Sequence, residues 1–251
     1  MTSSPAYLFD LDGTLVDTAP DLLATMNMLL TRAGHAPLGP EVLRRLVGRG
    51  ARKLIADAFR VTGAPLTPEE IEPLYADFLK DYGSHIAAAS RPFPGVVETL
   101  ECLKAQGTRM GVLTNKPHQN AMQLLTELGL TGYFATIAGG SKYPWLKPDP
   151  RLFESVLADL GGGPAVMVGD SVTDVQAARA SGAPVILMSY GYTPEPATTL
   201  GADLVLDDFR EVPAAAVARQ NSSPSRHKYR TFPFFTEFSA KTETYDVFSV
   251  W

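Results

Sequence analysis

Two aspartates separated by one residue, Asp10 and Asp12, follow a short apolar run at residues 7–9. The run predicts a buried strand. Because a buried strand cannot leave two unpaired carboxylates in its interior, we expect them at its carboxyl end, where open parallel sheets carry their sites. Gly13 then allows the chain to turn. Taken alone, the segment is more typical of an ordinary strand that ends in an Asp-Gly turn.

Three later segments also place chemically active side chains at the end of a strand or the start of a helix. They are Thr114-Asn115-Lys116 after an apolar run, Lys147-Pro148 before a helix, and Asp170 and Asp174 after a second apolar run. Oxygen ligands without His or Cys partners favour a hard divalent cation, and Mg²⁺ is the expected cofactor. Carboxylates, a lysine and such a cation are what phosphoryl transfer from a monoester requires.

In this order, the four segments resemble motifs one to four of the haloacid dehalogenase superfamily, and the resemblance extends from residue 7 to about residue 213. It implies that Asp10 is the nucleophile and forms an aspartyl-phosphate. Asp12 would then protonate the leaving oxygen and later activate a water molecule. The resemblance also implies that Mg²⁺ is held by the Asp10 carboxylate, the Asp12 backbone carbonyl and Asp170.

The resemblance further assigns the binding of the transferring phosphoryl group. Thr114 and Asn115 would hydrogen-bond to it, and Lys147 would pair with it and with Asp10. For Thr114 alone, a satisfied hydroxyl at a strand end is the simpler interpretation, and only its place among the other motifs favours a functional role.

Three more residues near these motifs are site candidates. Asp174 follows Asp170 by one helical turn and would contact either metal-bound water or Lys147. The roles of Ser171 and Lys116 stay undecided at this point: each residue is either part of the site or a solvated loop residue.

Strand and helix patterns alternate between residues 91 and 206, which predicts an α/β fold with a Rossmann-like parallel-sheet core covered on both faces. The predicted helices are residues 94–106, 119–128, 150–160 and 172–181, and the predicted strands are residues 109–114, 136–138, 165–169, 185–188 and 204–206.

Between the first strand and residue 91 the pattern is helical throughout, which predicts a small all-helical cap inserted after strand 1. Four apolar stripes support this prediction, and Thr67 is a candidate cap for the fourth helix. The second stripe consists of Leu43, Leu46 and Val47. We expect a core domain at residues 1–16 and 91–213 and a cap domain at residues 17–90, joined through residues 17–20 and 90–94.

Residues 214–251 form a tail of different composition. Between Arg219 and Trp251 there are eight aromatic residues but no Leu, Ile or Gly, and neither helical nor strand periodicity is evident. The tail therefore predicts a disordered or loosely attached segment, with a partner-binding role as the alternative.

The amino-acid composition excludes several classes of protein. With 22 basic and 27 acidic residues the net charge is −5, which gives no basic field for nucleic acid or an anionic membrane surface. The single cysteine, Cys102, excludes an internal disulfide, and its helical pattern predicts a small core residue. No apolar run approaches the length of a membrane span. We expect a cytoplasmic enzyme, either a monomer or a homodimer, that acts on a small-molecule phosphate ester.

Within the superfamily, the acid at Asp12 argues for phosphoryl chemistry, because a dehalogenase needs no acid there. A phosphonatase needs a cap lysine, for which Lys53 is the only nearby candidate. A sugar-phosphate mutase shares all four motifs and stays open, as does a phosphatase of another sugar or small metabolite. A non-catalytic binding module is the least favoured alternative, because unpaired buried acids are costly to retain.

Five segments in cap and core resemble the bacterial members of the superfamily that hydrolyse 2-phosphoglycolate. They are residues 17–22, 47–51, 91–96, 114–117 and 189–192. This resemblance implies that 2-phosphoglycolate is also the substrate of this chain. Arg49, between Gly48 and Gly50, could clamp the carboxylate of such a substrate, and the alternative is a solvated surface arginine.

Overall fold

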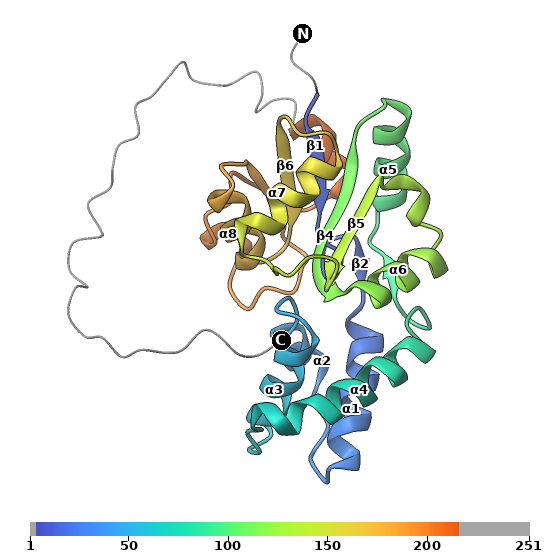
Figure 1. Ribbon diagram of the computed structural model, residues 1–251, viewed down its shortest axis with the longest axis vertical. Helices are drawn as coiled ribbons and strands as arrows, with labels where there is room; N and C mark the ends of the chain where they lie inside the picture. Colours follow the sequence, from blue (N-terminus) through green and yellow to red (C-terminus); the bar gives the residue numbers. More distant parts are fainter. Residues whose placement is uncertain (1–3, 216–251) are drawn as a thin grey trace, which may run out of the picture.

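Six parallel strands form the central sheet of the structure, a computed structural model that describes residues 4–215 (Figure 1). Their order across the sheet is β5-β4-β1-β6-β7-β8. The strands are β1 (Ala6–Phe9), β4 (Met110–Pro117), β5 (Thr136–Gly140), β6 (Ala165–Gly169), β7 (Val185–Met188) and β8 (Leu204–Leu206). β1 lies in the middle, where Phe9 is in register with Val112 of β4 and Val168 of β6. The predicted α/β parallel-sheet fold is confirmed.

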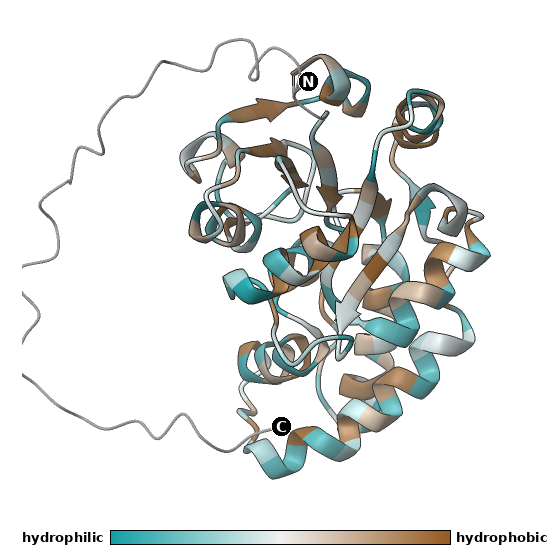
Figure 2. Cartoon of the chain, turned by 45° about the horizontal axis from the view of Figure 1, so that its top comes forward, coloured by the Kyte–Doolittle hydropathy of each residue, from teal (hydrophilic) through white to brown (hydrophobic). Residues whose placement is uncertain are grey.

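Helices cover both faces of this sheet. Figure 1 shows α5 (Val96–Ala105) and α6 (His118–Glu127) on one side and α7 (Pro150–Asp159) and α8 (Val172–Ala180) on the other. The two faces of β1 alternate accordingly, since Phe9 packs in the apolar cluster that contains α5 and α6 residues, and Leu8 in the cluster of α7 and α8. The strands are mostly apolar, and the helices carry both apolar and polar bands (Figure 2).

The predicted position of Cys102 in the core is wrong, because the structure exposes it. The buried stripe of α5 runs through Val96, Leu100 and Leu103. Cys102 lies outside that stripe, on the same helix.

Four helices are inserted between two short antiparallel strands, β2 (Val16–Asp17) and β3 (Arg91–Pro92). They are α1 (Ala19–Arg32), α2 (Pro40–Arg44), α3 (Ala51–Val61) and α4 (Pro68–Ser84). Figure 1 shows them grouped beyond one end of the sheet, so the helical insertion is confirmed. Thr67 caps α4 as predicted, because its hydroxyl accepts from the Glu70 N–H and the Glu70 carboxylate accepts from the Thr67 N–H.

The second cap helix is shorter than predicted, because α2 ends at Arg44 and the chain then turns. Gly48 and Gly50 have φ values of 109° and 88°, a conformation that favours glycine and that carries this loop toward the core. The apolar residues Leu46 and Val47 pack against the core cluster from the turn rather than from a helix.

The two connections between the insertion and the sheet are held together by Asp21, which is 3% exposed. Its carboxylate accepts hydrogen bonds from the Ala89 N–H, the Ser90 N–H and the Ser90 hydroxyl.

The division into a core domain (1–16 and 91–213) and a cap domain (17–90) stays a prediction. The interpretation of the tail concerns residues that lie, from residue 216 on, outside those described.

Three 3₁₀ turns complete the described chain, at Thr131–Tyr133, Ala197–Thr199 and Phe209–Glu211. From residue 4 to residue 215, no helix combines the length and the apolar content that a bilayer crossing needs.

Candidate active site

The candidate site lies where three neighbouring strands end. Asp10 follows β1, Asp170 follows β6, and Thr114 and Lys116 belong to the last part of β4. Because β4 and β6 flank β1, their carboxyl ends bring these side chains together. The register between β4 and β5 shifts between Leu113 and Pro117, so the pleat is interrupted where β4 carries its polar side chains.

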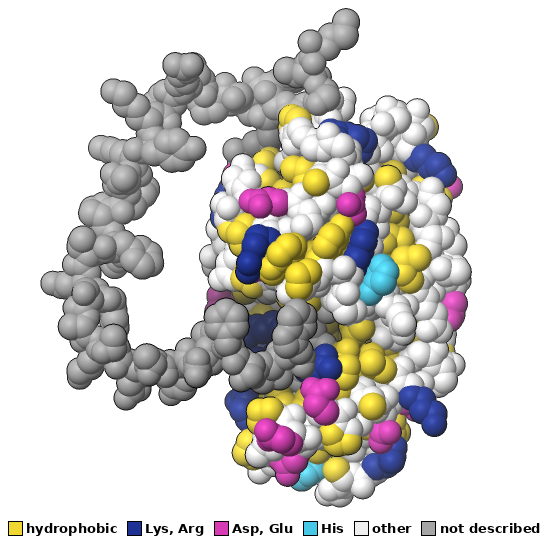
Figure 3. Space-filling view, viewed as in Figure 1, with side chains coloured by type: hydrophobic (Ala, Val, Ile, Leu, Met, Phe, Trp, Pro, Cys, Tyr) yellow, Lys and Arg dark blue, Asp and Glu magenta, His cyan; other side chains and the backbone are white. Residues whose placement is uncertain are grey.

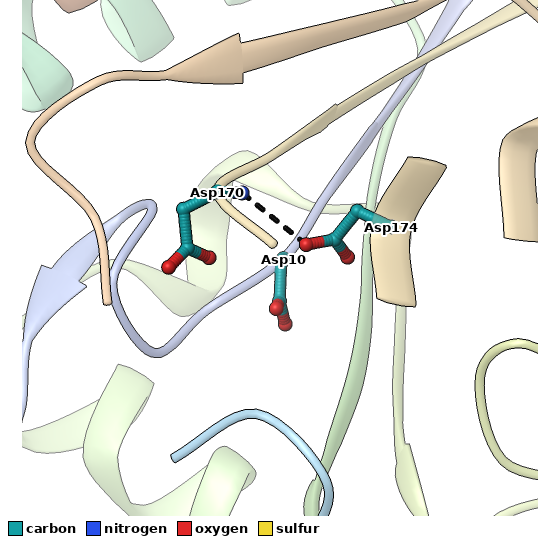
Figure 4. A group of neighbouring side chains, drawn as sticks. All are labelled: Asp10, Asp170 and Asp174. Atoms are coloured by element: carbon teal, nitrogen blue, oxygen red, sulfur yellow. Dashed lines mark hydrogen bonds between the residues drawn. The ribbon is translucent and has the colours of Figure 1, made fainter. Parts of the chain in front are cut away.

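Asp10, Asp170 and Asp174 form a buried acidic group (Figure 4). One carboxylate oxygen of each lies within 4.8 Å of the others, and the residues are 4%, 2% and 0% exposed. Asp170 is fixed on both oxygens, because Oδ1 accepts from the Thr14 hydroxyl at 3.0 Å and Oδ2 from the Tyr192 N–H at 2.7 Å. The three carboxylates are therefore held in position by the protein.

Two glycines make room for the Asp170 carboxylate. A Cβ on Gly13 would lie 2.4 Å from Asp170 Oδ2, and a Cβ on Gly191 would lie 2.1 Å from Asp170 Cβ. Gly13 also has a φ of 84°, which a side chain would disfavour. Any larger residue at either position would displace this carboxylate.

Lys147 is the buried cation of the acidic group. Its Nζ lies 2.9 Å from Asp10 Oδ2 and 2.6 Å from Asp174 Oδ1. Burial lowers the pKa of Lys147, but the carboxylates of Asp10 and Asp174 outweigh burial and hold that pKa above the ordinary lysine value. Lys147 is therefore charged at neutral pH.

Both carboxylate oxygens of Asp174 accept hydrogen bonds. Its Oδ1 faces Lys147, and its Oδ2 accepts from the Asp170 N–H, the Ser171 N–H and the Ser171 hydroxyl (the first is the dashed line in Figure 4). Of the two contacts expected for Asp174, the structure contains the one with Lys147. Ser171 contacts Asp174 at the start of α8, which accounts for it as part of the helix cap.

The phosphate-binding candidates of β4 differ in what they can still bind. Thr114 is buried, lines the inner chamber described below and accepts the Lys116 N–H at 3.2 Å. The Asn115 side chain instead holds the backbone of Lys147 on both sides and donates to the Gly48 carbonyl at 3.3 Å. Asn115 therefore positions Lys147 and contacts the cap loop.

Asp12 lies in a different environment from Asp10. Its Oδ1 is 2.9 Å from Lys116 Nζ, which also donates to the Tyr82 hydroxyl of α4 at 2.7 Å. Lys116 is 5% exposed, so the alternative of a solvated loop residue is wrong. Tyr82 was not among the sequence candidates, although it continues the apolar stripe of α4 and a buried tyrosine hydroxyl requires a partner.

Two adjoining cavities open between the cap helices and the core. The inner chamber is lined by Asp10, Asp12, Thr114, Lys116 and Tyr82 together with apolar cap residues, and it leaves only about 30 Å³. The outer cavity, of about 540 Å³, is lined by Arg49, Arg52, Tyr75 and the loop around Lys142. Lys and Arg side chains lie around the hollow between core and cap (Figure 3). The structure does not bring Arg49 into the chamber, and Arg49 is exposed.

The electrostatics of the site favour a bound cation. Four carboxylates (Asp10, Asp12, Asp170 and Asp174) against two ammonium groups (Lys116 and Lys147) leave a formal charge of −2. Burial raises the pKa of Asp10 to about 6, opposed by Lys147 and reinforced by Asp174. Burial, reinforced by Asp174 and Asp10, also raises the pKa of Asp170 well above its ordinary range.

A divalent cation fits these residues. It would balance the excess negative charge, and its preferred ligands are carboxylate and carbonyl oxygens. Asp10, Asp170 and Asp174 each offer a carboxylate oxygen to the group, and the oxygens of Asp174 also accept hydrogen bonds from Lys147 and the start of α8. The acidic group can therefore hold a metal ion, with Lys147 beside it.

Comparison with known proteins agrees with this geometry. Residues 7–188 match the family model of the haloacid dehalogenase-like hydrolases. A phosphoglycolate phosphatase of Caulobacter vibrioides is 45% identical over 86% of this chain and 92% of its own length, and one of Agrobacterium fabrum is 43% identical over 82% and 89%. The crystal structure of a predicted phosphoglycolate phosphatase from Haemophilus somnus 129pt superposes with a TM-score of 0.79 at 34% identity, over 86% of this chain and 99% of that one.

Proposed function

The chain belongs to the haloacid dehalogenase-like hydrolases, and from this we propose that it is a Mg²⁺-dependent phosphatase that hydrolyses 2-phosphoglycolate to glycolate and phosphate. One observation carries the proposal: two aspartates two positions apart, Asp10 and Asp12, are each paired with a different lysine at the same end of the sheet. Two carboxylates in separate environments can take the separate roles of nucleophile and acid.

In the first step, a carboxylate oxygen of Asp10 attacks the phosphorus of the ester. The bond between phosphorus and the ester oxygen breaks, and Asp12 delivers its proton to that oxygen, so glycolate leaves as an alcohol. Asp10 then carries the phosphoryl group. The Leu11 N–H, which donates to Asp10 Oδ1 at 2.7 Å, and Lys147 on Oδ2 hold the nucleophile in position.

In the second step, water attacks the phosphorus of the aspartyl-phosphate. Asp12, now a carboxylate, takes a proton from that water, and the bond between phosphorus and the Asp10 oxygen breaks. Phosphate leaves, Asp10 is a carboxylate again and Asp12 is again protonated. The small volume and the apolar side chains of the inner chamber leave little room for water beside these two residues.

The Asp10 and Asp170 carboxylates and the Asp12 backbone carbonyl would hold Mg²⁺. The ion supplies positive charge that allows a carboxylate and a phosphate dianion to approach each other. Lys147 and Thr114 would contact the transferring phosphoryl group, while Asn115 and Asp174 keep Lys147 in place through their hydrogen bonds to its backbone and its ammonium group.

A screen of the purified protein against a panel of small phosphate esters tests the proposal. Phosphate release should require Mg²⁺, and kcat/KM should be highest for 2-phosphoglycolate. A higher value for another sugar or metabolite phosphate would reassign the substrate, and conversion of a sugar phosphate to its isomer without phosphate release would indicate a mutase. A cytoplasmic location and a monomeric or homodimeric state stay predictions.

A further inference from the structure

The inner chamber has a single basic side chain among its described lining residues, Lys116. Lys147 does not line the chamber, because its ammonium group is turned to Asp10 and Asp174. Arg49 lines the outer cavity. A negatively charged group on the leaving side of a small substrate would therefore meet Lys116 before any other described cation.

The cap already contacts the core where Arg49 lies. Asn115 Nδ2 donates to the Gly48 carbonyl, and a Cβ on Gly50 would be 3.4 Å from the Asn115 carbonyl oxygen. With the flanking glycines against the core, Arg49 still lines only the outer cavity. In this arrangement of cap and core its guanidinium does not line the chamber of Asp10 and Asp12.

Lys116 and Tyr82 have hydrogen-bond donors to spare. An ammonium group has three N–H donors, and in the described chain those of Lys116 serve Asp12 and the Tyr82 oxygen. The O–H of Tyr82 has no acceptor within residues 4–215. Burial, with the charges of Asp12 and Asp21, raises the pKa of Tyr82 well above its ordinary value, so the hydroxyl keeps its proton. One N–H and one O–H are thus free to donate to a single carboxylate.

Their position fits the chemistry of the proposed substrate. Asp12 must approach the ester oxygen, and Lys116 Nζ is 2.9 Å from Asp12 Oδ1. In 2-phosphoglycolate the carboxylate and the ester oxygen are attached to the same methylene group. A cation beside Asp12 is therefore also beside that carboxylate when the ester is in place.

The cap side chains beside Tyr82 in the chamber would not stabilise a carboxylate. They include Leu22, Val47, Leu54 and Phe78, all apolar. Burying a charged group without a partner is unfavourable, and the Asn115 side chain is already engaged by Gly48 and Lys147, so a carboxylate against this apolar wall is best stabilised by the donors of Lys116 and Tyr82.

We propose that Lys116 of the core and Tyr82 of the cap together form the carboxylate-binding subsite that selects esters of 2-hydroxy acids. The inference deepens the proposed function and rests on it. Because one donor comes from α4 and the other from β4, the subsite is complete only when the cap covers the core. Arg49 is the rival candidate for the same role.

The test compares kcat/KM for 2-phosphoglycolate with that for ethyl phosphate, which carries a methyl group in place of the carboxylate. Tyr82→Phe removes only the hydroxyl, and the ratio of the two values should fall about tenfold or more, which corresponds to about 1.4 kcal/mol, because the hydrogen bond to the carboxylate is lost with 2-phosphoglycolate only. Activity on ethyl phosphate should fall less than activity on 2-phosphoglycolate, because ethyl phosphate has no carboxylate to lose its partner, and the ratio removes any effect that the two substrates share. Tyr75→Phe, the same change on the same helix but outside the chamber, should leave the ratio unchanged.

Lys116→Met should lower the ratio further, about a hundredfold, but it also removes the partner of Asp12, so Tyr82→Phe is the decisive variant. A ratio that Tyr82→Phe leaves within twofold of the wild-type value would overturn the proposal, and a loss confined to Arg49→Ala would assign the carboxylate to Arg49. Failure of the proposed function is a separate outcome. If the wild-type protein hydrolysed other esters without favouring 2-phosphoglycolate, both the proposed substrate and the carboxylate-binding subsite would be wrong.

Discussion

Asn115 binds the backbone of Lys147 on both sides: its Oδ1 accepts the Lys147 N–H at 2.8 Å, and its Nδ2 donates to the Lys147 carbonyl at 3.0 Å. The two residues are far apart in sequence, yet this pair of bonds sets where the Lys147 side chain begins. The ammonium group then reaches Asp10 and Asp174. The side-chain amide of Asn115, predicted to bind phosphate, thus positions Lys147, which belongs to a different motif.

Asn115→Ala should therefore impair both stability and catalysis. Two buried backbone groups of Lys147 lose their partners, which costs about 1–3 kcal/mol of unfolding free energy for each group that stays unpaired. A displaced lysine should lower kcat about a hundredfold. Urea unfolding and steady-state kinetics measure the two effects. A variant with normal kcat would show that Lys147 keeps its position without Asn115.

Asp10→Asn should abolish phosphatase activity and leave the fold intact. The change removes the nucleophile at nearly constant volume, and kcat should fall by a factor on the order of 10⁴ or more. Phosphate release is measured together with the circular dichroism spectrum. If a tenth of the wild-type rate persisted after deamidation had been excluded, a covalent intermediate on Asp10 would be ruled out.

Mg²⁺ should stabilise the protein through the acidic group. At a concentration about a hundredfold above its dissociation constant, a cation that binds only the folded state adds about 2.7 kcal/mol, which raises the melting temperature by about 5 °C or more. Chelation with EDTA should reverse the shift and stop turnover. Asp170→Asn should weaken the response to Mg²⁺. A full response in that variant would place the ion away from Asp170.

The metal-free protein should lose stability as the pH rises from about 4 to about 6. The pKa of Asp10 is raised to about 6 in the folded state from 3.8, so over this range the folded state holds a proton that the unfolded state has released. The stability that protonation of Asp10 contributes is therefore fully present below about pH 4 and is lost as the pH rises through about 6.

The raised pKa of Asp170 also makes the free energy of unfolding fall as the pH rises. Acids with lowered pKa values, such as Asp149 and Asp208, make it rise with pH instead. The comparison is therefore between wild type and Asp10→Asn, unfolded by urea in EDTA at pH 4.5 and pH 6.5. The variant should gain stability relative to wild type at the higher pH. An unchanged difference between the two proteins would contradict the raised pKa.

Much of the fold and of the candidate site can be predicted from the sequence. Strand periodicity placed β6, β7 and β8 at their observed bounds, and helix patterns placed α7 and α8 to within a residue at their ends. Asp10, Asp12 and Asp170 were predicted at strand ends, because a buried strand excludes unpaired charges from its interior. These features depend on neighbours in the chain, which the sequence displays directly.

The tertiary structure alone decided which of these side chains meet. Lys116 is buried because Asp12 reaches it from the loop after β1 and Tyr82 reaches it from α4. Arg49 lines the outer cavity because of how the cap packs on the core. Cys102 is exposed because the packing of α5 buries a different stripe. Periodicity reports which face of an element is apolar. The partner of a buried polar group, by contrast, depends on the packing of elements that are distant in the chain.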